Sequence, residues 1–284
     1  MSPEQIADER RRGRLAAAAA VLAAGLFVGA AVWSESLSND APERNGPALL
    51  RYFTHHSGAL IGSSILRGLG LLFLLAVTMH LWRATKARRP EEPQVVFVMG
   101  VYGPIAAGIG TIAVGIALAV AASSFVDRAF QTIEAADDAF RTVQLIGLLS
   151  FSGSLALAFW FVKGCLDAMR IGLLDRVTGI VGIVLGPGLI IFSGLFQFVL
   201  PVWLLAVAGI FTGRSLRALP PAWEAGEARP WPSARDAFAG TLDDGLRTTT
   251  PNGEVEAVGP GVRTPDEPED TAGEPARRKR KRRR

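Results

Sequence analysis

The stretch VVFVMGVYGPIAAGIGTIAVGIALAVAA, residues 95–122, contains no charged side chain over 28 consecutive positions. The hydrocarbon core of a bilayer is about 30 Å thick, and a helix needs roughly 20 apolar residues to cross it. Lipid offers no hydrogen-bond partner to an unpaired backbone group, so a helix is the expected conformation. The stretch therefore predicts a helix that crosses a membrane.

Further apolar runs extend this prediction to an all-α membrane bundle. Residues 177–213 have no charged side chain over 37 positions. A single helix of that length would measure about 55 Å, which is too long for one span. We expect two spans that turn near residues 196–201, where Gln197 and Pro201 interrupt the apolar run. The six predicted spans, within a transmembrane domain of residues 15–217, are 15–33, 59–82, 95–122, 143–162, 177–195 and 198–213.

Basic residues between the spans predict the orientation of the bundle. The connections on one side hold 13 Lys and Arg residues, including four within the N-terminal segment 1–14, whereas those on the other side hold four. Lys and Arg near membrane spans are enriched on the cytoplasmic side. This pattern predicts a multi-pass protein of the cell membrane with both termini in the cytoplasm. A cleavable signal peptide is the alternative for residues 15–33, but the run is long for a signal-peptide core and no good small-x-small cleavage site precedes Ser34.

The composition changes after the last predicted span, and residues 218–284 are predicted to form a disordered cytoplasmic tail. Residues 224–276 contain 12 acidic and four basic side chains and few apolar ones, too few to offset the entropy of ordering. Eight consecutive basic residues follow: Arg277, Arg278, Lys279, Arg280, Lys281, Arg282, Arg283 and Arg284. They are compatible with a solvated tail, with contact to anionic lipid headgroups, or with binding of RNA or another polyanion.

Small residues recur at every fourth position of the third predicted span. They are Gly103, Ala107, Thr111, Gly115, Ala119 and Ser123. A ridge of small side chains lets the backbone of another helix approach closely. We expect this ridge to pack against a helix of the same chain, of a second copy or of another membrane protein. The alternative is that it reflects only an Ala- and Gly-rich composition.

Two features inside the predicted spans are candidates for a functional role. Gly186, Pro187 and Gly188 predict a kink or a short unwound segment, which is either structural or part of a solute site. Arg67 is the one charged residue well inside a span. It is either an anchor whose side chain reaches the outer interface or a contact for a solute or partner.

The sequence contains no pattern of catalytic, cofactor-binding or metal-binding residues. No histidine follows His80, so the last four predicted spans lack a histidine base for nucleophilic catalysis. Lys163 and Asp167, four positions apart, predict an ion pair at the inner boundary. Cys165 is the single cysteine, which excludes a disulfide within the chain. We expect neither an enzyme nor a bound cofactor or metal.

Two segments carry a resemblance to a known group of proteins. The segments are LPPAWEAGEARPWP, residues 219–232, and DAMRIGLLDRVTGI, residues 167–180. With the acidic and polybasic tail they resemble a family of uncharacterised actinobacterial six-helix membrane proteins. The resemblance covers most of residues 45–232, implies the same six-span layout and implies no activity.

The leading functional expectation is a non-enzymatic membrane protein with a structural or partner-binding role. The first alternative is a transporter or channel for a small solute that uses Arg67 and the predicted break in the fifth span. The second alternative is a helper for membrane-protein insertion, in which the basic tail binds the ribosome.

Overall fold

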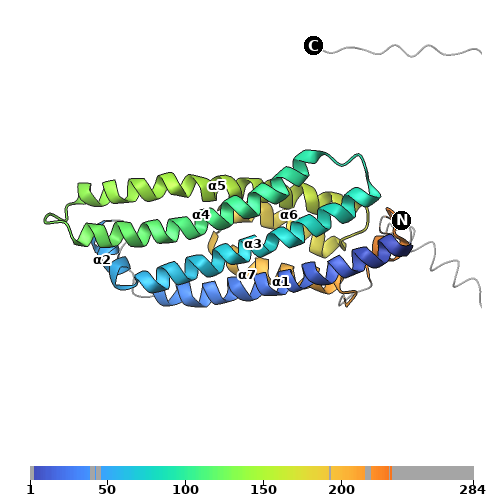
Figure 1. The fold of residues 1–284 in the computed structure, drawn as a ribbon, viewed down its shortest axis with the longest axis horizontal. Coiled ribbons are helices and arrows are strands. Elements are labelled where there is room, and N and C mark those ends of the chain that lie inside the picture. Colours follow the sequence, from blue (N-terminus) through green and yellow to red (C-terminus); the bar gives the residue numbers. More distant parts are fainter. Residues whose placement is uncertain are drawn as a thin grey trace, which may run out of the picture. The chain divides into compact units, whose positions relative to one another are not determined.

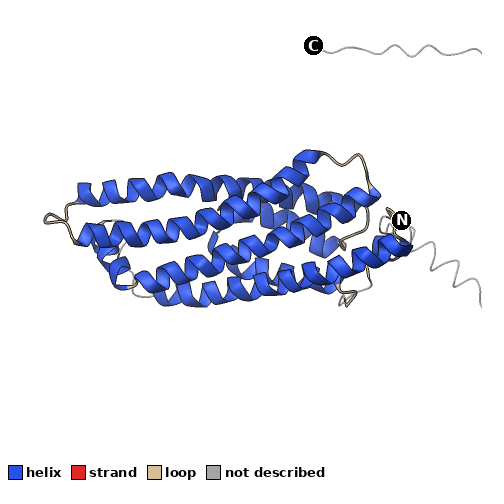
Figure 2. Cartoon of the chain, viewed as in Figure 1, coloured by secondary structure: helices blue, strands red, loops and turns tan. Residues whose placement is uncertain are grey.

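The computed structural model describes residues 3–38, 42, 46–191, 193–214, 219–229 and 231. Within these residues all regular secondary structure is helical, which confirms the predicted all-α class (Figures 1 and 2). The chain up to Trp231 forms one compact unit.

Four long helices make up most of the bundle. They are α1 (Pro3–Ser38), α3 (Ser57–Arg88), α4 (Gln94–Val126) and α5 (Ile133–Arg170). At about 1.5 Å per residue they measure roughly 48–57 Å, more than the ~30 Å core of a bilayer. All four are long enough and apolar enough to cross a membrane. A short helix, α2 (Pro47–His55), lies between α1 and α3.

The last apolar run folds as two shorter helices, α6 (Arg176–Ile191) and α7 (Ser193–Phe211). The helix break lies between Ile191 and Ser193, so the predicted turn at residues 196–201 is wrong, and Pro201 lies inside α7. A proline removes one backbone hydrogen bond, which membrane helices tolerate when neighbouring groups compensate. With 16 and 19 residues, these helices measure about 24 and 28 Å.

The helices close into a ring in which each long helix packs against two or more others. Going around it, α1 packs on α3, α3 on α4, α4 on α5, α5 on α6, α6 on α7, and α7 returns to α1. The ring buries the large side chains of Trp160, Phe161, Trp203 and Leu157. A second, smaller apolar cluster around Leu50 joins α2 to α4 and α5.

The small-residue ridge on α4 contacts two neighbouring helices. A methyl group on Gly103 would lie 2.8 Å from the backbone nitrogen of Leu157 in α5. Ala107 meets Gly153 of α5 so closely that a methyl group on Gly153 would overlap the Ala107 backbone. Thr111 Oγ1 lies 3.2 Å from Ser150 Oγ, also on α5.

The remainder of the ridge faces elsewhere. A methyl group on Gly115 would overlap Ser64 of α3, Ala119 is buried, and Ser123 is exposed. From Gly103 to Gly115 the ridge therefore packs closely against two helices of the same chain. An additional close crossing, which the four-residue spacing missed, pairs Gly108 of α4 with Gly68 of α3.

Candidate functional site

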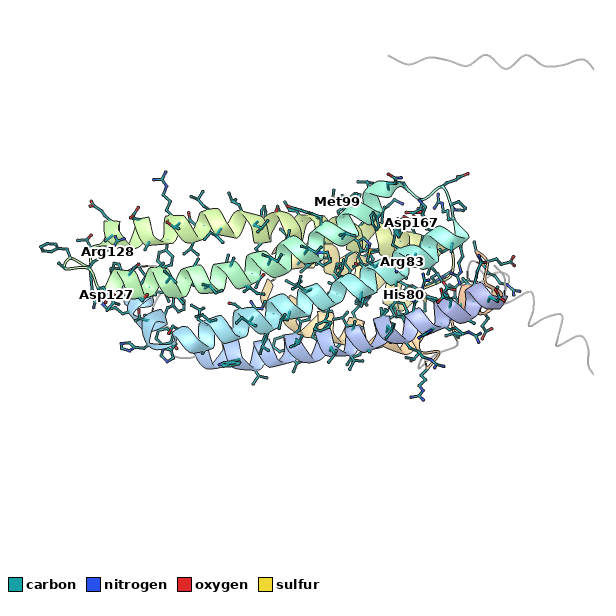
Figure 3. The ribbon with its side chains drawn as sticks, in the orientation of Figure 1. His80, Arg83, Met99, Asp127, Arg128 and Asp167 are labelled. Carbon is teal, nitrogen blue, oxygen red and sulfur yellow. The ribbon has the colours of Figure 1, made fainter. Side chains whose placement is uncertain are left out.

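Buried charged side chains gather at the end of the bundle where α1 begins, which we call the N-terminal end. It also contains the last turns of α3, α5 and α7 and the first turns of α4 and α6. Figure 3 shows His80, Arg83 and Asp167 toward this end, and Asp127 and Arg128 in the turn at the opposite end. Because a buried charge must be paired to be tolerated, the buried Arg88, Glu92 and Asp167 need partners.

Arg88, at the end of α3, is the centre of the first cluster. Its side chain is fully buried, and it donates two hydrogen bonds to Glu9 of α1, at 2.7 Å and 3.0 Å. It also donates from Nε and Nη2 to the carbonyl oxygen of Ala222, at 3.2 Å and 3.0 Å. A planar guanidinium matches a carboxylate in this two-bond geometry, which is among the stronger polar contacts in proteins. We call Arg88, Glu9 and the Ala222 carbonyl the Arg88 joint.

Residues 219–229 and Trp231 lie against the α5–α6 connection rather than extending into solvent. Trp223 Nε1 donates to Leu173 O at 2.9 Å, and Trp231 Nε1 donates to Leu174 O at 3.0 Å. The backbone pairs as well, from Ala222 N to Gly172 O. Helix α8 (Pro221–Ala225) forms within this segment.

These contacts correct the predicted boundary of the disordered tail, which was residue 218. The carbonyls after α5 have no partner within a helix, and the two indole N–H groups supply one. Gly172 has φ +78° and a methyl group there would overlap the Arg229 carbonyl, so this close approach requires glycine. Residues 232–284, including the basic run 277–284, lie outside the described part of the chain.

His80 lies beneath this segment as a buried aromatic contact. Its ring stacks on Trp223, with centroids 5.6 Å apart and planes at 11°, and meets Phe211 edge-on at 4.6 Å. Within the described residues its Nε2 has no hydrogen-bond partner. His80 therefore joins α3 to α7 and to α8 by ring packing.

Glu92 and Asp167 form the second cluster, between the α3–α4 turn and the end of α5. Both carboxyl groups are almost completely buried. Lys163 pairs with Asp167, as predicted, and its Nζ lies 3.6 Å from Glu92 Oε1. Arg89 reaches Asp167 Oδ1 at 3.7 Å. Two acids thus share two basic partners.

This packing shifts the pKa of Glu92. Burial raises the pKa of Glu92 above the usual glutamate value, and a hydrogen bond to Asp167 and the Asp167 charge raise it further. Lys163 and Arg89 act in the opposite direction. If both acids are ionised, Glu92 Oε1 and Oε2 and Asp167 Oδ1 lack a hydrogen-bond partner among the described residues. A proton on Glu92 would allow one hydrogen bond between the two carboxyl groups.

A small cavity adjoins the Glu92–Asp167 pair. It measures about 10 Å³ and is lined by both acids and by Thr85, Trp82 and Trp160. The indole N–H groups of Trp82 and Trp160 have no hydrogen-bond partner among the described residues. The space is sufficient for about one water molecule, which could bridge an indole N–H to a carboxyl oxygen.

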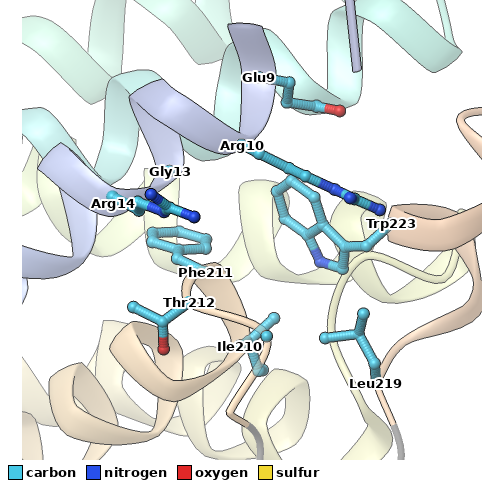
Figure 4. A pocket seen from close by; sticks show the side chains of 10 residues that line it. Glu9, Arg10, Gly13, Arg14, Ile210, Phe211, Thr212, Leu219 and Trp223 are labelled. Carbon is cyan, nitrogen blue, oxygen red and sulfur yellow. The ribbon is translucent and has the colours of Figure 1, made fainter. Parts of the chain in front are cut away.

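Two larger pockets flank α1 at the N-terminal end. The first measures about 300 Å³ and lies between α1, the end of α7 and the segment from Leu219 to Trp223 (Figure 4). Arg10 and Arg14 line it on the α1 side. The second measures about 310 Å³ and lies between α1 and α3, next to His80, Arg83 and Arg12.

The residues singled out from the sequence do not converge on one site. Arg67 is half-buried on α3, next to the Gly68–Gly108 crossing. Gly186, Pro187 and Gly188 lie within α6, which continues through them as a helix, so of the two predicted alternatives the kink remains a prediction and the unwound segment does not fit. Gly186 instead allows a close contact with the Ala158 carbonyl of α5. In the described residues no cluster of His, Cys, Asp and Glu side chains is placed to hold a metal ion.

Of the two charged clusters at the N-terminal end, the sequence predicted only the Lys163–Asp167 pair. The Arg88–Glu9 pair was not predicted, because pairing across 79 positions leaves no local pattern. The one available signal was the pair of tryptophans in residues 219–232, which is unusual for a solvated tail.

Comparison of the chain with models of protein families, with curated proteins and with solved structures gives no match. The resemblance of residues 167–180 and 219–232 to the actinobacterial membrane proteins therefore stays a prediction.

Proposed function

We propose that the protein is an integral protein of the cell membrane with both termini in the cytoplasm and a non-enzymatic, structural or partner-binding role. The Arg88 joint is the observation that supports this most. It connects Glu9, before the first apolar run, to Ala222, after the last one. Both ends of the apolar domain therefore lie at the same end of the bundle.

The outer surface of the bundle supports membrane insertion. Large apolar side chains are exposed along all six major helices, and Val32, Leu145 and Val184 are each about two-thirds exposed. A water-soluble protein rarely exposes an apolar surface of this extent, whereas lipid chains solvate it. The basic residues at the N-terminal end then favour the cytoplasmic side for that end.

We further propose that four helices cross the membrane and that α6 and α7 enter and return as a hairpin. Gly186 contacts Ala158, and α6 continues only from there to Ile191, about 8 Å. From Ala158 to Val143, where the apolar part of α5 begins, the distance is about 22 Å. The end of α6 therefore falls about 15 Å short of the level of Val143. Both termini remain on one side in this arrangement, as in the six-span prediction.

A solute path is less well supported than a structural role. The transporter alternative depended on a broken helix at Gly186-Pro187-Gly188, and α6 is continuous there. The charged groups at the N-terminal end are instead used in pairing helices, as in the Arg88 joint. The partners that we propose are the lipid bilayer and another protein. The basic run 277–284 would contact anionic headgroups or another polyanion.

Affinity purification in mild detergent tests the partner-binding role. The full chain should be recovered from the membrane fraction together with specific proteins, and a variant lacking residues 277–284 should lose those that depend on the tail. Purification of the full chain with lipid alone, under several mild detergents, would contradict a partner-binding role. Salt-sensitive co-sedimentation with ribosomes would favour the insertion-helper alternative instead.

A further inference from the structure

We propose that the pocket between α1, α7 and residues 219–223 binds a phosphate group, and that its ligand is the headgroup of an anionic phospholipid. This rests on the proposed membrane location and goes beyond it by assigning a ligand to a defined site. The pocket of about 300 Å³ is at the lower end of the size range of small-molecule sites.

The charges in the pocket favour an anion. Arg10 and Arg14 lie four positions apart, on the same face of α1, and both line the pocket. Neither forms an ion pair with another described residue, in contrast to Arg12, which pairs with Asp8. The remaining charged group, Glu9, already accepts two hydrogen bonds from Arg88. Two arginines without an ion-pair partner among the described residues thus line the pocket, and guanidinium groups suit the geometry of a phosphate.

The other walls of the pocket favour a lipid over a soluble anion. Ile210, Phe211 and Leu219 supply apolar surface, and Trp223 adds an aromatic ring (Figure 4). Tryptophan is enriched at the level of lipid headgroups. The pocket also lies where the surface changes in character, because Leu15, directly after Arg14, is 70% exposed and begins the apolar run of α1.

The neighbouring pocket between α1 and α3 serves as an internal comparison. It has nearly the same volume and also contains arginines, but it includes Asp8 and Glu9 together with Arg12. Since Arg12 is already paired with Asp8, this pocket offers less uncompensated positive charge. We therefore assign the phosphate to the Arg10–Arg14 side of α1.

The test uses full-length protein extracted from membranes, with Arg10→Gln, Arg14→Gln and the matched control Arg11→Gln. Arg11 is exposed on the same helix and lines neither pocket. Binding of dioleoylphosphatidylglycerol, dioleoylphosphatidylcholine and inorganic phosphate is measured by native mass spectrometry and by the shift in thermal midpoint. All variants keep the basic run 277–284, so its contribution is the same in each.

We expect phosphatidylglycerol to bind the wild type and Arg11→Gln equally well. Each of Arg10→Gln and Arg14→Gln should weaken its binding by about fivefold, in line with roughly 1 kcal/mol per basic residue at a membrane surface. An equal effect of inorganic phosphate would support the phosphate site but make a free anion its ligand. Equal phosphatidylglycerol binding by all three variants would overturn the site. Absence of the protein from the membrane fraction would instead overturn the proposed function.

Discussion

Arg88 illustrates at the residue scale how this bundle holds its N-terminal end together. One guanidinium joins α1, α3 and the segment after α7, and it is fully buried. Burying a charge pair costs desolvation energy, so its net contribution is small, but removing one member leaves the other unpaired. The role of Arg88 is therefore to specify which segments meet.

Replacement of Arg88 by alanine should destabilise the protein by about 3–5 kcal/mol, because the Glu9 carboxylate is then left nearly buried without a partner. Thermal unfolding in detergent measures the change. The double variant Glu9→Gln, Arg88→Met should be less destabilised than Arg88→Ala, since no unpaired charge remains. Equal losses in Arg88→Ala and in the exposed control Arg11→Ala would contradict a structural role of the joint.

The raised pKa of Glu92 predicts that the stability of the protein depends on pH. Its pKa is raised in the folded protein, so the folded state holds a proton more tightly than the unfolded state does. The contribution of Glu92 to stability should therefore be fully present below the usual glutamate pKa and should be lost as pH rises toward the raised value, by at most about 1.4 kcal/mol per pH unit. The groups that face Glu92 are Asp167, Lys163 and Arg89.

Thermal midpoints measured in detergent between pH 5 and pH 8 check this prediction. Glu92→Gln should flatten the curve, because an amide cannot ionise and can still donate a hydrogen bond to Asp167. Glu91 is the exposed neighbour of Glu92. The matched control Glu91→Gln should keep the wild-type slope of thermal midpoint against pH. A Glu92→Gln curve parallel to the wild type would show that Glu92 does not carry the proton.

At the scale of helices, close backbone contact between α4 and α5 depends on glycines with no room for a side chain. Gly153→Ala should destabilise the bundle by about 1–3 kcal/mol, because the added methyl group would overlap the Ala107 backbone, which cannot move aside easily. Gly147→Ala, on the same helix, would meet only Val114 Cγ2 at 3.9 Å and should be nearly neutral. Equal thermal midpoints for the two variants would contradict this account of the contact.

The sequence predicted helices well and their ends less well. Apolar runs identify membrane helices because every buried backbone group must be paired within the helix. The α6–α7 break was misplaced because Gln197, Pro201 and Gly186-Pro187-Gly188 all look like interruptions, and tertiary contacts decide which one is used. Ordering of residues 219–231 depends on carbonyls some 50 positions away, a relation that no local pattern reveals.

The candidate site was less predictable than the fold for the same reason. The spacing of Lys163 and Asp167 predicted their ion pair, but the addition of Glu92 requires α4 and α5 to be side by side. The small residues from Gly103 to Gly115 predicted close packing. The ridge changes its partner helix from α5 to α3 because the helices cross, which the spacing does not reveal. The spacing of charged residues along the sequence does not predict long-range pairs such as Arg88 and Glu9.

At the scale of the whole molecule, we propose a membrane bundle in which both ends of the apolar domain lie at its basic end, on the cytoplasmic side. The Arg88 joint and the indole hydrogen bonds of Trp223 and Trp231 hold two segments of the chain together. One segment precedes the apolar part of α1, and the other follows α7. The turn between α4 and α5, with the exposed residue Ala129, lies at the opposite end (Figure 3). If α6 and α7 form a hairpin, Ile191 lies within the lipid.

Labelling of single cysteines in intact cells with a membrane-impermeant thiol reagent, in a Cys165→Ser background, tests this claim most directly. Ala129→Cys should react from outside, whereas Glu91→Cys and Ala228→Cys, at exposed positions of the N-terminal end, should react only after the cells are permeabilised. Ile191→Cys should stay unreactive in both conditions if α6 and α7 form a hairpin, and reaction from outside would restore the six-span layout. Labelling of Ala129→Cys and Glu91→Cys from the same side would contradict the membrane-spanning bundle itself.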